Sequence, residues 1–395
     1  MGIHRGLNIV RDGLLFGYDT GYGVADNSTA TRFYPGEPTT NLVTTNLETL
    51  GTDGSGQSSV GTRTTIAPNH VRIVDVTSNT RQSHLIQGLT ASTTYTVSIQ
   101  FKKVTGTPTF RFQIQGYNNS SYVSTIKFTN TAETGLLDID GWQTAKWTFT
   151  LPSNCNAARI WWQDGADYTT YTHTFELKNP QLEAKGHVTP YVSGTRSSTQ
   201  SLIDLKRTTN IDVSNASFDS TGQPDLDGTG DFIKASSTHS ITGDITLEGV
   251  FNEDTSSSPH TTVICTDKDY QYGVKLMAFK NSSRYGLWLG FGSSSYIAMV
   301  DGSFSNNTSY HLAGSWDRSS GVVKIYLNGD LKSTISTGQT SAVSLNEAKV
   351  VVGADYHSLS YGLNGKVYVG KVYNKVLTDA EVKQNYNAYK NRFNI

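Results

Sequence analysis

The alternation of apolar and polar residues with a period of two constrains this chain more than any other feature of its sequence. Tyr95, Val97, Ile99 and Phe101 alternate with polar neighbours. This spacing places alternate side chains on opposite faces of a strand, whereas a helix needs apolar residues three and four positions apart. Similar segments recur along the chain at Phe110–Ile114, Trp147–Phe149, Arg159–Trp162, Thr172–Leu177, Ile245–Leu247, Leu287–Phe291, Val323–Leu327, Val350–Val352 and Val367–Val372. Because residues typical of turns separate them, we expect an all-β fold with two antiparallel β-sandwich or jelly-roll domains.

A tight hairpin turn is expected at Asn328-Gly329, directly after the alternating residues Val323, Ile325 and Leu327. Asn and Gly both tolerate a positive φ, which a type I′ turn requires at both of its central residues. The pair therefore predicts that the chain reverses here into another strand.

One short helix is expected near the C-terminus. Thr378 and Glu381 have the spacing of a capping box, in which the Thr side chain and the Glu side chain each bond the other residue's backbone N–H. Val382, Tyr386 and Tyr389 follow at a spacing that places them on one stripe of a helix. We expect this helix to dock on a sandwich through that stripe.

The composition indicates a folded chain with a weak overall field. Charged residues make up 16% and aromatic residues 11%, whereas a disordered chain is rich in charge and poor in aromatics. The formal net charge is −1, which gives no long-range attraction to nucleic acid. The sequence also lacks the run of about 18 apolar residues that a transmembrane helix requires. We therefore expect neither a nucleic-acid partner nor a membrane.

The expected place of synthesis is a reducing cytoplasm. Met1–Arg5 has neither the apolar core nor the small-residue cleavage site of a secretory signal. Cys155 and Cys265 lie far apart in sequence, and we expect both to be free thiols.

Two segments have the composition of connectors. Residues 20–40 and 190–200 are rich in Thr, Ser, Gly and Pro. Before the first connector, Gly13–Asp19 has the pattern of a single strand with no neighbouring strand to pair with. This strand requires a partner from elsewhere in the chain.

Several segments of the second half resemble the laminin-G-like, concanavalin A-like sandwich family. They are Asp227–Ile233, Tyr310–Asp317, Val323–Gly329, Asn364–Val367 and Val372–Thr378. The family often opens with a strand similar to Gly13–Asp19. The resemblance therefore implies a discontinuous domain, with residues 1–25 as an N-terminal arm and first strand, residues 196–395 as the rest of the sandwich, and residues 38–195 as an insertion. Insertion at a loop with neighbouring ends is well tolerated.

The insertion resembles the carbohydrate-binding-module jelly rolls of phage tail and capsid-fibre proteins. The similar segments are Gly36–Leu42 at its start and Asn179–Glu183, Thr189–Tyr191 and Gly194–Ser197 at its end. The resemblance implies that the chain is a component of a phage particle.

The motifs of common enzymes are missing from the sequence. Glucan-cleaving sandwiches of the concanavalin A type carry a Glu-x-Asp-x-x-Glu strand, because a retaining mechanism needs two carboxylates about 5–5.5 Å apart. That strand does not occur here, nor does a Gly-x-Ser-x-Gly sequence or a metal-type spacing of His. Asp138 and Asp140 adjoin a turn and are interpreted as a solvated loop edge. We therefore expect a protein without enzymatic activity.

The first candidate glycan site comprises Trp161, Trp162, Asp164, Tyr168 and Tyr171. Aromatic rings stack on the apolar faces of sugars, while carboxylates bond the hydroxyl groups. The alternative is a packing role, because adjacent residues on a strand point to opposite faces and at least one Trp would then lie in the core.

The second candidate glycan site comprises Asp355, Tyr356, His357 and Tyr361. These residues precede the closing strand, at a rim where the resemblance places ligand loops. The alternatives are an ordinary polar loop and a contact between subunits.

Structural calcium is the cofactor that the resemblance suggests. Glu48 and Glu183 match the positions where jelly rolls of this kind often hold an ion, and Asp227 and Asp231 form an acidic turn. Calcium needs 6–8 oxygen ligands, which must converge in space. The alternative for Asp231 is a cap on its own turn.

These observations lead to a virion-surface protein as the first hypothesis. It would be a capsid decoration, head fibre or tail appendage that adheres to host cell-surface glycans, with many weak contacts combined by avidity. Its expected partners are other virion proteins and further copies of itself, with a trimer as the expected homo-oligomer. The second hypothesis is a purely structural protein that cements the shell, and the third is a glycan-degrading enzyme.

Overall fold

The structure is a computed structural model of the chain. It describes residues 8–20, 35–44, 46–49, 61–75, 81–106, 108, 110–130, 132–137, 140–164, 173–254, 260–267, 272–279, 283–292, 294–302, 305–340, 345–355 and 361–395. Within these residues the fold is made of antiparallel sheets and one α-helix, which confirms the predicted all-β class.

The chain divides into two compact units. Unit 1 contains residues 1–38 and 197–395, and unit 2 contains residues 39–196. The divisions fall next to the predicted boundaries at residues 38, 195 and 196. Each unit has its own apolar core.

Two facing sheets form unit 1. Within the described residues, the strands of sheet I are β1 (Leu14–Asp19), β27 (Asn364–Tyr373), β18 (Ile245–Glu253), β23 (Thr308–Asp317), β24 (Val322–Leu327) and β25 (Asp330–Ser336) in spatial order, with β15 (Leu226–Asp227) also paired to β27. The strands of sheet II are β13 (Leu202–Ile203), β14 (Asn210–Asn215), β16 (Phe232–Ala235), β26 (Leu345–Val352), β19 (His260–Asp267), β20 (Tyr272–Phe279), β21 (Arg284–Phe291) and β22 (Ser294–Asp301), with β17 (His239–Ile241) also paired to β26. The N-terminal strand β1 thus finds its partner in β27, more than 300 residues later.

Alternate residues of the two sheets meet in the core of unit 1. Leu247 and Leu312 of sheet I and Leu276 and Leu287 of sheet II are all fully buried in one apolar cluster. The removal of this apolar area from water is the main source of stability for such a sandwich.

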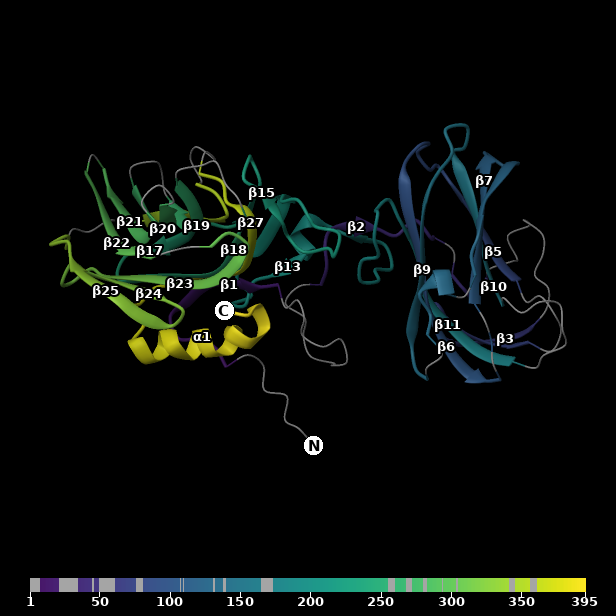
Figure 1. The fold of residues 1–395 in the computed structure, drawn as a ribbon, viewed down its shortest axis with the longest axis horizontal. Helices are drawn as coiled ribbons and strands as arrows, with labels where there is room; N and C mark the ends of the chain where they lie inside the picture. The colour runs from purple at the N-terminus through teal and green to yellow at the C-terminus, as the bar shows by residue number, and fades with distance from the viewer. Residues whose placement is uncertain are drawn as a thin grey trace. The chain divides into compact units, whose positions relative to one another are not determined.

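Helix α1 (Asp379–Phe393) covers the other face of sheet I, so that unit 1 has three layers (Figure 1). The capping box is confirmed, because Glu381 N donates to Thr378 Oγ1 at 3.2 Å and Thr378 N donates to Glu381 Oε2 at 2.8 Å. Val382 and Tyr389 are fully buried against the sheet, and Tyr386 is half-buried.

The turn between β24 and β25 is also confirmed. Asn328 and Gly329 have φ values of 50° and 76°, so both central residues are in the left-handed region. A side chain at residue 329 would also collide with the ring of Tyr386 on α1, which adds a steric reason for glycine.

Two further sheets form unit 2. Within the described residues, sheet III contains β5 (Arg81–Gln87), β10 (Ala157–Asp164), β7 (Phe110–Asn118) and β8 (Ser121–Phe128). Sheet IV contains β3 (Gly61–Ala67), β4 (His70–Asp75), β11 (His173–Glu183), β6 (Thr94–Thr105) and β9 (Gln143–Thr150). The two ends of the unit pair with each other, as β2 (Thr39–Thr40) with β12 (Thr195–Arg196). Two short 3-10 helices complete the described structure, η1 (Ala132–Thr134) in unit 2 and η2 (Ser198–Gln200) in unit 1.

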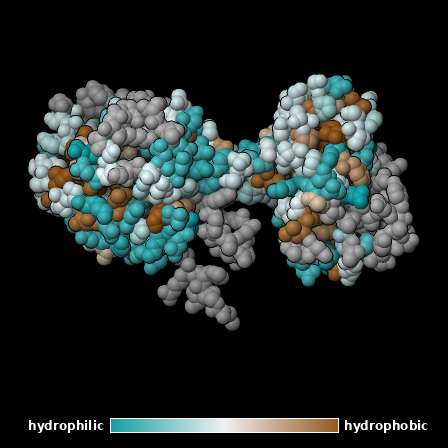
Figure 2. Space-filling view, viewed as in Figure 1, coloured by the Kyte–Doolittle hydropathy of each residue, from teal (hydrophilic) through white to brown (hydrophobic). Residues whose placement is uncertain are grey.

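The visible surface is mostly hydrophilic. On the face in Figure 2, hydrophobic residues are scattered in small groups among hydrophilic ones. Cys155 and Cys265 are buried, and neither forms a disulfide. Across the described residues, α1 is neither long nor apolar enough to cross a membrane, and no other helix is.

Candidate functional site

The adjacent residues Trp161 and Trp162 lie on opposite faces of β10. Trp162 points into the core of unit 2 and is 1% exposed, and Trp161 points to the outer face of sheet III but is only 7% exposed. Neither ring is an open platform for a sugar. The pair therefore behaves as strand alternation requires, with one ring given to packing.

Trp161 belongs to a cluster on the outer face of sheet III. Trp161 Nε1 and Tyr117 Oη donate to Gln115 Oε1 at 3.1 Å and 3.3 Å. The Arg159 guanidinium lies 5.0 Å from the ring centre of Tyr117 and 5.9 Å from that of Trp161. The indole N–H of Trp161 and the rings of Trp161 and Tyr117 are the groups that would bind a sugar, and they already contact Gln115 and Arg159. The side chain of Asp164, and all of Tyr168 and Tyr171, lie outside the described residues.

Asp355 belongs to a buried charged cluster on the outer face of sheet II. Lys275 Nζ lies 2.5 Å from Asp355 Oδ2 and 3.3 Å from Asp267 Oδ2, and all three side chains are at most 7% exposed. The ammonium group also lies 4.6 Å from the ring centre of Trp288. Two acids thus share one built-in cation, the ammonium group of Lys275.

Burial raises the pKa of Asp267 to about 8, since Asp355 adds to this effect and Lys275 only partly opposes it. Asp267 is therefore mostly a neutral acid at pH 7. Both carboxyl groups are buried around Lys275 and leave no open site for a sugar, unlike the separated pair of a glycosidase.

Tyr361 lies at the edge of the same domain. Its half-buried ring is 5.8 Å from that of His260, and its carbonyl accepts a hydrogen bond from Thr262 N at 2.9 Å. Tyr356 and His357 lie outside the described residues.

The four predicted calcium ligands are engaged in protein contacts. Both oxygens of the buried Glu183 accept bonds from Thr189, from its hydroxyl at 2.5 Å and its N–H at 3.0 Å, and Thr39 donates at 2.8 Å. Through Thr39 and Thr189, Glu183 therefore joins the start of unit 2 to its end. Glu48 Oε1 accepts a bond from Asn69 N at 2.7 Å.

Asp227 and Asp231 organise their own turn. Asp227 Oδ1 accepts from Thr229 N at 2.6 Å, and Asp231 Oδ2 accepts from Ser217 N at 3.1 Å and Asp227 N at 3.2 Å. These contacts fit the capping alternative for Asp231. Within the described residues, no three His, Cys, Asp or Glu side chains are grouped in a way that would hold a metal ion.

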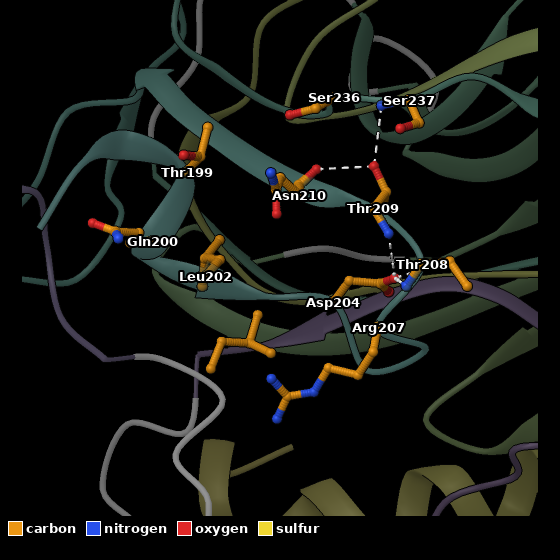
Figure 3. A pocket seen from close by; sticks show the side chains of 11 residues that line it. Thr199, Gln200, Leu202, Asp204, Arg207, Thr208, Thr209, Asn210, Ser236 and Ser237 are labelled. Atoms are coloured by element: carbon orange, nitrogen blue, oxygen red, sulfur yellow. Dashed lines mark hydrogen bonds between the residues drawn. The ribbon is translucent and has the colours of Figure 1, made fainter.

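An open polar pocket of about 390 Å³ lies in unit 1 at the end of sheet II that carries β13 and β14 (Figure 3). Its walls come from η2, β13, the turn that follows it, the first residue of β14 and Ser236-Ser237. This volume is within the range of about 300–1,000 Å³ that small-molecule sites occupy.

Asp204 shapes one wall of this pocket. Its Oδ2 accepts from Thr208 N at 2.9 Å, Thr208 Oγ1 at 3.2 Å and Thr209 N at 3.3 Å. Its Oδ1 accepts from Gly17 N of β1 at 3.2 Å. The 3%-exposed carboxylate thus ties the turn to the first strand of the unit. This bonding holds Arg207 at a φ of 63°.

The exposed lining groups suit a ligand with many hydroxyl groups. Gln200 and Asn210 carry amides that donate and accept, as the hydroxyl groups of a saccharide do. In Figure 3 the guanidinium of Arg207 extends away from the Asp204 carboxylate. It is a cation that offers five N–H donors to a ligand. The lining residues include no aromatic side chain, so recognition here would rest on hydrogen bonds and not on stacking.

A comparison of the sequence with known protein families finds a match in unit 1, the unit that holds the pocket. Residues 227–383 match the Concanavalin A-like lectin/glucanases superfamily. The match lies within unit 1, so this part of the chain is similar to concanavalin A-like lectins and glucanases. The matched residues include most of both sheets of the unit and the start of α1, and the pocket shares Ser236 and Ser237 with the matched segment.

Solved structures with similarity to the chain include lectin-like and carbohydrate-binding domains. A heptameric SAP-like pentraxin from Limulus polyphemus has 17% identity and a TM-score of 0.33, over 40% of this chain and 78% of that one. The CBM40 of a Ruminococcus gnavus sialidase, bound to α2,3-sialyllactose, has 16% identity and a TM-score of 0.32, over 38% and 94%. Domain 4 of a Geobacillus stearothermophilus arabinanase has 18% identity and a TM-score of 0.37, over 48% and 93%. Scores this low carry no argument about function. No functionally curated protein matches the sequence.

Neither the pocket nor the partners of Asp355 could be predicted from the sequence. The pocket residues come from segments 199–210 and 236–237, in which no local motif marks a ligand site. Lys275 and Asp267 lie on neighbouring strands, and only the register of β19 with β20 brings them together. The one available signal was a charged residue at an apolar-rich strand position, as with Lys275 between Val274 and Leu276.

Proposed function

We propose that this protein is a non-enzymatic adhesion component of a phage virion surface that binds host glycans through its concanavalin A-like domain. The observation that carries the proposal is the pocket beside that domain, with its amide, hydroxyl and guanidinium lining. A saccharide would place hydroxyl groups against Gln200 and Asn210 and accept hydrogen bonds from Arg207.

The arrangement of the two units supports a displayed protein. Unit 2 begins and ends in one small sheet, β2 with β12, and so has the form of a module inserted into a loop of unit 1. The segments around that sheet are those that resemble phage fibre modules. We further propose that the protein forms a homotrimer with other virion proteins around it, because several copies convert weak glycan contacts into useful avidity.

A glycan array of the assembled protein tests this proposal, after light scattering has established its mass. We expect selective binding to one class of glycan. Arg207→Ala should reduce that binding about tenfold or more, since a charge-assisted hydrogen bond is lost. Lys206→Ala is the matched control, because its side chain is exposed, adjacent and not part of the pocket lining.

The outcomes separate the hypotheses. Equal loss in the two variants would place the binding outside the pocket. Loss of glycan binding when calcium is chelated from the wild-type protein would indicate that calcium holds the binding loop. No binding by a folded oligomer would leave the shell-cementing role, and release of reducing sugars would revive the enzyme hypothesis.

A further inference from the structure

A cationic and aromatic cluster lies on the outer face of sheet IV in unit 2, opposite the core. We name it the Trp142 cluster, and its members are His70, Arg72, Lys102, Trp142, Glu176 and Lys178. The register of three neighbouring strands builds it, because Arg72 pairs with Glu176 and Glu176 pairs with Lys102. Residues on one face of paired strands lie side by side.

The only carboxylate of the cluster is fully used by two members. Glu176 Oε1 accepts from Arg72 Nη2 at 2.6 Å and Nε at 3.0 Å. Glu176 Oε2 lies 3.1 Å from His70 Nε2. The acid is 4% exposed, whereas the Arg72 side chain is 45% exposed. Both carboxylate oxygens of Glu176 are therefore already in contact with Arg72 and His70.

The two lysines of the cluster converge on one indole ring. Lys178 Nζ lies 3.9 Å and Lys102 Nζ 5.9 Å from the ring centre of Trp142. The His70 ring packs nearly perpendicular to the same indole, with the two ring centres 5.2 Å apart. Both lysines and Trp142 are half-buried. Among the described residues, neither ammonium group has a carboxylate within 4.0 Å.

Two close ammonium groups repel each other, and the indole offsets only part of this cost. A cation–π contact contributes about 0.5–1 kcal/mol at an exposed site. Burial lowers the pKa of Lys178, and Lys102 lowers it further, although Glu176 partly opposes both effects. An anion between the lysines would relieve the repulsion and gain two charge-assisted hydrogen bonds.

From this charge imbalance we infer that the Trp142 cluster binds a carboxylate-bearing polysaccharide. One carboxylate of the chain would lie between Lys102 and Lys178, beside the indole of Trp142, whose face Lys178 already occupies. Gln100 lies beside Lys178 on the sheet and, with Asn179, which donates to Gln100 Oε1 at 2.9 Å, adds amides that bond neutral hydroxyl groups.

The size of the cluster argues against nucleic acid as the occupant. Duplex-binding proteins can contact about 6–10 phosphates, and the two lysines of the cluster, on a chain of net charge −1, fall short of that. The indole face is also occupied by an ammonium group and is not open for a base to stack on.

Calorimetric titration of the full chain with polygalacturonate tests the inference. We expect saturable binding at about 50 mM salt that weakens as the salt concentration rises. The fully methyl-esterified polymer has the same backbone without charge, and it should bind at least about tenfold more weakly. Equal binding of the two polymers would overturn the inference.

The variant Lys102→Gln/Lys178→Gln should weaken polygalacturonate binding about tenfold or more. Lys146→Gln is the control, because Lys146 is an exposed lysine on the same sheet and outside the cluster. Unchanged binding in the double variant, or an equal loss in the control, would refute the site. Equal or tighter binding of a short DNA duplex would refute a saccharide occupant.

This inference does not use the unit 1 pocket. Arg207→Ala should therefore bind polygalacturonate as the wild type does. Failure of either proposal can be recognised without reference to the other.

Discussion

At Asp267, burial and a neighbouring acid both oppose ionisation. The carboxyl group is 0% exposed, and its pKa is raised to about 8. Glycine at residue 273 permits this arrangement, because a Cβ atom there would overlap Asp267 Oδ1. Lys275 lies closer to Asp355 than to Asp267, so it offsets the burial of Asp267 only in part.

The raised pKa of Asp267 predicts a specific pH dependence of stability. Between about pH 4 and pH 8 the folded state holds a proton that the unfolded state releases, so stability falls as pH rises through this window. Asp267→Asn mimics the protonated acid and should flatten that slope, which for one group is at most about 1.4 kcal/mol per pH unit.

Urea unfolding of the wild type and Asp267→Asn at several pH values measures this effect. The exposed carboxylate of Asp301 gives a control, since Asp301→Asn should leave the slope unchanged. A wild-type stability that rises from pH 5 to pH 8, or identical slopes in the wild type and Asp267→Asn, would contradict the prediction.

At the scale of the element, helix α1 is held to sheet I by a buried polar network as well as by apolar contacts. Asn385 Nδ2 donates to Glu248 Oε2 at 2.7 Å and to Tyr373 Oη at 3.0 Å, and Asn385 Oδ1 accepts from Val10 N at 2.8 Å. Glu248 also contacts Lys371 and His311, at 3.3 Å and 3.0 Å. One asparagine thus joins the helix, the sheet and the N-terminal segment.

The charge of Glu248 depends on these partners. Burial by itself would raise its pKa, but Lys371 and the hydrogen bonds from His311 and Asn385 outweigh burial and lower the pKa to about 2. Glu248 therefore contributes stability above about pH 4.5 and loses it as pH falls towards about 2.

The network predicts that Asn385→Ala destabilises unit 1 by about 2–4 kcal/mol, because Glu248 and Val10 N lose buried partners. Asn387→Ala is the matched control, an exposed asparagine on the same helix, and should be neutral or slightly stabilising. Denaturant unfolding monitored by circular dichroism gives both values. Equal effects of the two substitutions would show that the network does not hold the helix.

At the scale of the whole molecule, the chain crosses between the units at one place. Thr39 pairs with Arg196 and Thr40 with Thr195, so the strand leaving unit 1 lies beside the strand returning to it. Antiparallel partners have Cα atoms about 4.5–5.5 Å apart. Among the residues that the structure describes, the main apolar cluster of each unit contains residues of that unit alone.

This connection predicts that the units fold separately. Residues 39–196 expressed alone should give a cooperative thermal transition. Replacement of residues 39–196 by a linker of about four Gly and Ser residues should leave unit 1 folded, because short loop closure costs little entropy. Calorimetry of the two pieces checks this. Loss of a cooperative transition in either piece would show that its core depends on the other unit.

The local rules of the sequence determined the strands, the capped helix at Thr378, the turn at Asn328-Gly329 and the family resemblance of the second half. These features depend on side-chain period, backbone φ and hydrogen bonds between residues a few positions apart, which a sequence displays directly. Tertiary structure alone decided that Trp162 packs in the core, that Lys275 lies between Asp355 and Asp267, and that segments 199–210 and 236–237 line a pocket. Those outcomes depend on strand register and on contacts between distant segments, and no local pattern encodes them.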